Sequence, residues 1–206
     1  ELITNVTDGG LSEWPQSLSL ADDTSNAGWD LNDLNVLYIG FDADGLSIGV
    51  DGVAAANNAI VVYLDFDYGS GSGEVPSTLQ YSAGALDSVI SSSAVSVYDS
   101  GFGAEWACGG FGGVGVDGFS DDAGCRRLDN PTDFAWFAST IAWGADGMEI
   151  RVPWDILALS PSNNGRTLGA FVRIINEDGG LVSPEGLPSS QAGDGSVDTV
   201  VTTWIP

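Results

Sequence analysis

Two aspartates at the end of an apolar run are the residues whose spacing most clearly predicts chemistry. Asp65 and Asp67 flank Phe66 and follow the β-branched and aromatic run at residues 59–64. Because side chains alternate between the two faces of a strand, both carboxylates are expected on one side, beside the Gly- and Ser-rich loop at residues 68–74. Ca2+ binds about six to eight oxygens from carboxylates, backbone carbonyls and water. The pair therefore predicts a Ca2+ site.

A second pair of aspartates lies in the turn at residues 42–45, between two runs that are expected to pair as a hairpin. Asp42 and Asp44 are predicted to add oxygens to the same Ca2+ site from this turn. The alternative for both pairs is that each aspartate only accepts hydrogen bonds from its own turn backbone.

The residue types that are absent limit catalysis. The sequence has no histidine and no lysine. Ser-His-Asp and Cys-His catalysis, histidine-bound zinc and Schiff-base chemistry all need one of these side chains. Paired carboxylates remain, but no two of them have a spacing that selects the acid and the second carboxylate of a glycosidase. We therefore expect a protein that is not an enzyme.

Aromatic and cationic side chains near polar segments are candidates for ligand binding. A sugar ring stacks its apolar C–H face on an aromatic ring, and Trp29, Trp106 and Trp136 lie in or beside such segments. Arg126 and Arg127 are two of the five cationic residues and are candidates for bonding a sugar or a uronate carboxylate. The alternatives are tryptophans buried in the core and arginines paired with nearby aspartates. The expected partner is a polysaccharide or another glycan.

The two cysteines predict a covalent link. Cys108 and Cys125 lie within a Gly- and Asp-rich insertion at about residues 99–133. A zinc site needs about four ligands, so a single disulfide that closes this loop is expected, with two free buried thiols as the alternative. On the chain-entropy model, closing a loop of that size contributes about 3 kcal/mol to stability.

The charge of the chain excludes some partners. The formal net charge is −24, from 29 acidic residues against five arginines. Such a chain repels nucleic acid and anionic membranes, so neither is an expected partner. The charge fits either a solvated acidic surface or folding and assembly that depend on cations. Without a membrane-spanning apolar run or a basic, hydrophobic leader, the sequence predicts no membrane insertion and a mature exported protein, secreted or at the cell surface.

The elements that must position these residues are nearly all strands. A proline at position 153 begins the one expected helix, of one or two turns, over residues 153–159. About ten strands at this spacing predict an all-β, two-sheet antiparallel β-sandwich of jelly-roll type, forming a single domain over residues 1–206. The main strands and hairpins are expected at residues 36–50, 59–67, 134–152, 167–176 and 196–205.

Four stretches of the sequence carry a family resemblance: residues 8–14, 37–50, 62–67 and 148–157. In their order they resemble the family-9-type carbohydrate-binding modules and their DOMON-like relatives, including the C-terminal modules of glucodextranase-type proteins. The last stretch is similar to that group's strand followed by a proline-started turn of helix. The resemblance implies an exported jelly-roll-like β-sandwich, often calcium-bearing, that in many members binds sugars through aromatic side chains.

Together these features predict a secreted, non-catalytic carbohydrate-binding module that is stabilised by Ca2+. The rival prediction is a structural subunit of an extracellular filament, matrix or cell-surface layer. Such a subunit would assemble with copies of itself through exposed strand edges. The high content of Gly and Ser, and the absence of lysine that would blunt those edges, favour the rival.

Overall fold

The structure is a computed structural model that describes part of the chain. The described residues are 9–22, 32–54, 58–70, 72–73, 97–98, 101–111, 123–128, 134–136, 141–143, 146–157, 159, 167–176, 182–188, 196–197 and 200–203. Within them the chain forms fourteen strands and one 3-10 helix, η1 (Gln16–Leu18). No helix in this part of the chain is long and apolar enough to cross a membrane.

Sheet A contains five strands in the order β1-β2-β3-β10-β9. Its hairpin is the predicted one, and it is closed where the Asp42 amide donates to the Gly45 carbonyl at 3.1 Å. The third strand of the sheet, β3, also pairs with β10, so a segment from late in the chain lies beside the hairpin. The bounds are β1 (Ser19–Asp22), β2 (Asp33–Phe41), β3 (Gly45–Val53), β9 (Ile141–Trp143) and β10 (Gly147–Pro153).

Sheet B contains seven strands, in the order β12-β11-β4-β6-β7-β8 with β14 also paired to β11. The bounds are β4 (Asn58–Asp65), β6 (Trp106–Phe111), β7 (Ala123–Arg127), β8 (Phe134–Trp136), β11 (Thr167–Asn176), β12 (Val182–Leu187) and β14 (Val200–Thr203). The strand β4 lies between β11 and β6 and every residue in it is buried, which confirms the predicted central strand. A separate parallel pair joins β5 (Val97–Tyr98) and β13 (Ser196–Val197).

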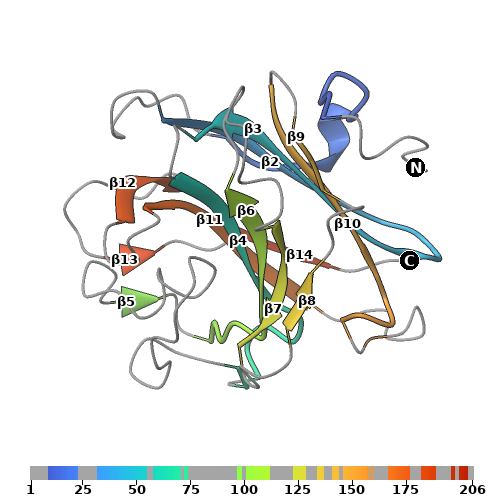
Figure 1. The fold of residues 1–206 in the computed structure, drawn as a ribbon. Helices are drawn as coiled ribbons and strands as arrows, with labels where there is room; N and C mark the ends of the chain where they lie inside the picture. Colours follow the sequence, from blue (N-terminus) through green and yellow to red (C-terminus); the bar gives the residue numbers. More distant parts are fainter. Residues whose placement is uncertain are drawn as a thin grey trace.

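The two sheets pack face to face, which confirms the predicted all-β sandwich. In Figure 1, β2, β3, β9 and β10 cross the upper part of the view, and β4, β6, β7 and β11 lie below them. One core fills the space between the sheets because alternate residues of each strand point inward. Its members include Leu37, Ile39, Leu46, Ile48, Val50, Met148 and Ile150 from sheet A and Ile60, Val62, Leu64, Trp106, Val172 and Ile174 from sheet B. The number of strands exceeds the predicted ten because several have only two to four residues.

The predicted disulfide is present. Cys108 of β6 and Cys125 of β7 lie directly opposite each other in the antiparallel register, and their sulfurs are bonded. Their Cα atoms are 4.1 Å apart, and both side chains belong to the core. The bond therefore joins two adjacent strands of sheet B at the base of the insertion.

The predicted helix over residues 153–159 is wrong. Pro153 still belongs to β10, and the residues after it form turns whose hydrogen bonds have three different spans. The amides of Ile156 and Leu157 donate to the Pro153 carbonyl, and the amide of Leu159 donates to the Trp154 carbonyl. Trp154 and Leu157 are buried in the core. Their packing favours these irregular turns over the regular hydrogen bonds of a helix. This turn places two leucines at one end of the sandwich.

Candidate metal centre

Three carboxylates meet at the end of sheet B where β4 ends and β6 begins. Leu64 lies opposite Trp106 in the β4–β6 register, and the Glu105 amide donates to the Leu64 carbonyl at 3.0 Å. This register places Glu105 beside Asp65, the last residue of β4. One carboxylate oxygen from each of Asp65, Asp67 and Glu105 lies within 4.8 Å of the others. These three residues are called the acidic triad below.

Glycines allow the loop after β4 to lie directly against the chain before β6. Gly73 has a φ of 80°, and a Cβ atom there would lie 2.2 Å from the Gly103 carbonyl oxygen. A Cβ atom on Gly103 would lie 1.7 Å from the Ser72 carbonyl oxygen. The Gly69 amide donates to the Gly101 carbonyl at 2.9 Å. Only glycines permit the two segments to approach this closely. The close approach places Ser72 beside the acidic triad.

Backbone amides hold the innermost carboxylate of the triad. Asp65 is only 1% exposed. Its Oδ2 accepts a hydrogen bond from the Gly103 amide at 2.8 Å, and its Oδ1 accepts one from the Asp67 amide at 3.0 Å. The second bond closes a local turn at the end of β4 and fixes Asp67 next to Asp65. The position of Asp67 is therefore set by this turn, because β4 ends at Asp65.

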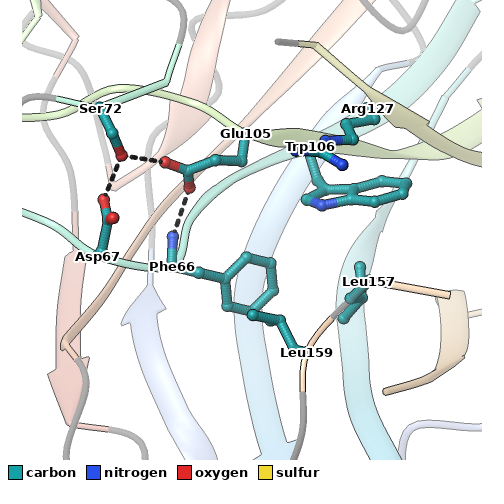
Figure 2. A pocket seen from close by; sticks show the side chains of 8 residues that line it. All are labelled: Phe66, Asp67, Ser72, Glu105, Trp106, Arg127, Leu157 and Leu159. Carbon is teal, nitrogen blue, oxygen red and sulfur yellow. Dashed lines mark hydrogen bonds between the residues drawn. The ribbon is translucent and has the colours of Figure 1, made fainter. Parts of the chain in front are cut away.

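A serine hydroxyl joins the other two carboxylates of the triad (Figure 2). The Ser72 Oγ lies 2.6 Å from Asp67 Oδ1 and 2.9 Å from Glu105 Oε1. The Glu105 Oε2 accepts a hydrogen bond from the Phe66 amide at 2.7 Å, and the Ser70 Oγ donates to Asp67 at 2.5 Å. A hydroxyl carries one proton and can donate to only one carboxylate at a time. The second contact of Ser72 therefore favours a proton or a cation at the triad.

Burial raises the pKa values of two triad carboxylates. Burial is the largest cause that raises the pKa of Asp65 to about 6, and the charge of Asp67 adds to it. Burial likewise raises the pKa of Glu105 to about 7, with further repulsion from Asp65 and Asp67. Hydrogen bonds from backbone amides oppose these effects only in part. Full ionisation of the triad is therefore unfavourable unless positive charge is supplied.

A pocket of about 150 Å³ opens beside the triad. Figure 2 shows two parts of its wall: the carboxylates with the serine on one side, and the rings of Phe66 and Trp106 with the two leucines on the other. Arg127 is the one cationic side chain that lines it. The lining residues are Phe66, Asp67, Ser72, Glu105, Trp106, Arg127, Leu157 and Leu159.

The donor set of the triad suits a hard cation. All of its ligand atoms are oxygens, which Ca2+ and Mg2+ prefer, and it offers no thiolate or imidazole. Carboxylates with pKa values near neutrality are also suited to proton transfer, but this requires a substrate within reach. The arrangement is therefore a candidate metal centre with a small pocket beside it that has both polar and apolar walls.

The structure brings together only one of the two predicted aspartate pairs. Asp65 and Asp67 are both in the triad, whereas Asp42 and Asp44 lie in the hairpin turn of sheet A and do not belong to it. The Asp42 carboxylate pairs with Arg151 and accepts hydrogen bonds from the turn amides of Asp44 and Gly45. The hydrogen bonds from the turn amides match the alternative prediction, in which a turn aspartate accepts hydrogen bonds from its own turn backbone.

The predicted sugar-binding residues lie in different places. Trp106 is 5% exposed and packs in the core, which leaves little ring surface for stacking on a sugar. Arg127 lines the pocket. Trp29 lies outside the described residues, and of Trp136 in β8 and Arg126 in β7 the structure describes only the strand positions.

Glu105 is the residue of the site that sequence reasoning missed. It has no carboxylate neighbour in the sequence and belongs to the site only because β4 pairs with β6. The available signal was its place directly before a strand that begins at Trp106. That signal identifies a neighbour of Asp65 only once the pairing of the two strands is known.

No protein-family model matches this chain, and no curated protein matches it. The family resemblance drawn from the four sequence stretches therefore stays a prediction.

Proposed function

We propose that this chain is a non-catalytic β-sandwich binding module in which the acidic triad holds a Ca2+ ion. The observation that carries the proposal is the convergence of Asp65, Asp67 and Glu105 within 4.8 Å. Carboxylates this close repel one another, and burial adds a desolvation cost. A divalent cation offsets both costs in the folded state.

Ca2+ suits these ligands better than Mg2+. The triad is built from a strand end, a turn and a distant segment, and Ca2+ accepts such an irregular set of about six to eight oxygens. Mg2+ demands near-octahedral geometry and gives up its water reluctantly. Three carboxylates supply only part of a Ca2+ coordination shell, so water or the hydroxyl groups of a ligand would complete it.

We place carbohydrate binding at the pocket beside the triad. Asp67, Ser72 and Arg127 offer hydrogen-bonding groups for hydroxyls, while Leu157 and Leu159 offer an apolar wall for C–H groups. A volume of about 150 Å³ limits the occupant to one sugar unit or the end of a chain. The disulfide supports an oxidising, extracellular location.

The test compares thermal unfolding and glycan-array binding in Ca2+ and in chelator. Ca2+ at about a hundred times its Kd should stabilise the fold by about 3 kcal/mol, or roughly 6–10 °C in Tm. Glycan binding should need Ca2+ and should be lost in the Asp67→Asn variant. The exposed Asp44→Asn variant removes the same charge outside the triad and should behave like the wild type. An unchanged Tm in Ca2+ would overturn the metal site, and Ca2+ binding without any glycan signal would overturn only the carbohydrate part.

The edge strands that the structure describes give little support to the rival prediction, in which the chain is a structural subunit that assembles through exposed strand edges. The outer strands β8 and β9 have three residues each, and β1 has four with a register shift. On the opposite edge of sheet B, β12 contains Pro184 and its register with β11 is also irregular, while β14, which pairs with β11 in a regular register, has only four residues. Short, irregular or proline-bearing edges are typical of strands protected against pairing with other chains.

A further inference from the structure

The acidic triad has a closed side and an open side. Asp65 is 1% exposed, whereas Asp67 and Glu105 line the pocket (Figure 2). The amides of Gly103 and Asp67 donate hydrogen bonds to Asp65. The Phe66 amide donates one to Glu105. Because the positive end of an N–H group repels a cation, an ion held by the triad would lie away from these amides, on the pocket side.

The separation of the triad oxygens fits one ion with open coordination positions. Two oxygens that each lie ~2.4 Å from the same Ca2+ are at most ~4.8 Å apart. The triad oxygens lie within 4.8 Å of one another, which meets this condition. Ca2+ takes about six to eight oxygens, so three carboxylates leave several positions to other ligands. Since the closed side supplies amides, these further oxygens would come from the pocket.

The polar wall of the pocket needs hydrogen-bond donors. With a cation bound, the carboxylates of Asp67 and Glu105 are ionised and can only accept hydrogen bonds. A sugar hydroxyl gives its oxygen to the ion and its proton to a neighbouring carboxylate at the same time. A uronate carboxylate has oxygens for the ion but no proton for this wall. The wall therefore favours hydroxyl groups over an acidic group.

The charges around the pocket also favour a neutral ligand. A bound Ca2+ together with Arg127 would balance the three ionised carboxylates of the triad, so the pocket would have no excess positive charge. The net charge of −24 on the chain repels an anionic glycan from a distance. Leu157 and Leu159 line the apolar part of the wall, which suits the C–H groups of a sugar ring.

We propose that the pocket binds the end unit of a neutral glycan, and that two vicinal hydroxyls of this unit chelate the Ca2+ ion while donating hydrogen bonds to Asp67 and Glu105. Two hydroxyls on adjacent ring carbons can bind one ion together, and the pocket of about 150 Å³ has room for one such unit. The inference rests on the proposed function and assigns its class of ligand and the way that ligand contacts the metal.

The experiment counts the waters on the bound ion. Tb3+, a hard cation that takes oxygen ligands as Ca2+ does, is bound to the full chain, and its luminescence lifetimes in H2O and D2O give the number of bound waters. The methyl glycosides of glucose, galactose and mannose are then added, with methyl glucuronoside and methyl galacturonoside as anionic counterparts. At least one neutral glycoside should bind and remove about two waters from the ion. It should bind at least about tenfold more tightly than the uronosides.

Two variants separate the pocket from the metal ligands. Leu159→Ala shortens the apolar wall without changing the triad, so binding of the neutral glycoside should weaken by about three- to tenfold while Tb3+ affinity stays the same. Val53→Ala is the matched control, because it shortens an exposed apolar side chain on β3 of sheet A. Its affinities for the glycoside and for Tb3+ should equal those of the wild type.

The possible failures are distinguishable. A neutral glycoside that binds without changing the number of waters would overturn chelation and leave the proposed function intact. Uronosides that bind as tightly as the neutral glycosides would overturn the choice of a neutral ligand. Tb3+ binding with no response to any of these glycosides would overturn the whole inference but not the metal site. Absence of both Tb3+ and Ca2+ binding would overturn the metal site of the proposed function itself.

Discussion

Two glutamates on opposite sides of this sandwich, Glu149 fully buried and Glu105 partly buried, have very different surroundings. Glu149 on sheet A accepts hydrogen bonds from the Trp14 indole and from the Gly9 backbone amide. Glu105 at the end of sheet B shares its site with two further carboxylates within 4.8 Å. The protein itself supplies the hydrogen-bond donors around Glu149. Glu105 lies where negative charge accumulates, so a cation from solution would stabilise it. A glutamate thus holds the fold together in one place and belongs to a candidate metal centre in the other.

The largest effect is expected from Glu149→Ala. This change leaves the Trp14 Nε1 and the Gly9 amide without their acceptor and creates a cavity. The free energy of unfolding should therefore fall by about 3 kcal/mol. Urea denaturation in Ca2+ and in chelator measures it, and the loss should be the same in both. A loss that appears only in Ca2+ would mean that Glu149 also acts through the metal.

The effect of Glu105→Gln on the free energy of unfolding should change sign when Ca2+ is added. In chelator at pH 8 the neutral amide removes a charge that burial and two neighbours disfavour, so the variant should be more stable than the wild type by roughly 1–2 kcal/mol. In saturating Ca2+ it should be less stable, because a ligand is lost. Paired urea curves in the two buffers check both signs. A variant that is destabilised equally in both buffers would place Glu105 in the same structural class as Glu149.

The pH dependence separates the triad from ordinary surface acids. Burial raises the pKa of Asp65 to about 6 and that of Glu105 to about 7, so between roughly pH 4 and pH 7 the folded state holds more protons than the unfolded state. In chelator the free energy of unfolding should therefore fall as pH rises through this window. Ca2+ should oppose that fall, because it binds the ionised carboxylates. Tm measured across this range should show the slope in the wild type, and an equal slope in Glu105→Gln would contradict it.

Ser72→Ala should have the smallest effect. The hydroxyl touches Asp67 and Glu105 but lies in an exposed loop, so its loss should weaken Ca2+ binding by about two- to tenfold and change stability by less than 1 kcal/mol. Calorimetric titration with Ca2+ provides the measurement. Complete loss of binding would make Ser72 a direct ligand and would enlarge the site.

The parts that could be predicted from the sequence are those governed by local pattern. The hairpin turn at residues 42–45 and the apolar run of β4 follow from turn chemistry and from alternating or continuous hydrophobicity. Asp65 and Asp67 were foreseen because they are neighbours in the sequence. The helix at 153–159 was not correct, because the packing of Trp154 and Leu157 overrode local preference.

The unforeseen parts depend on pairing between distant strands. Glu105 joins the triad through the β4–β6 register, whereas Asp42 lies in the hairpin turn of sheet A and pairs with Arg151 on β10. Trp106 is a core residue because its position in β6 points between the sheets. No local pattern in the sequence specifies which strands become neighbours, so these contacts became visible only in the folded chain.

The most direct test of the central claim is calorimetric titration of chelator-treated wild-type protein with Ca2+, alongside Asp65→Asn and Asp44→Asn. We expect one strongly bound Ca2+ per chain for the wild type and for Asp44→Asn. We expect no such binding for Asp65→Asn, whose carboxylate is the innermost of the triad. Absence of binding to the wild type, or equal binding to folded Asp65→Asn, would contradict the claim that these carboxylates form a metal site.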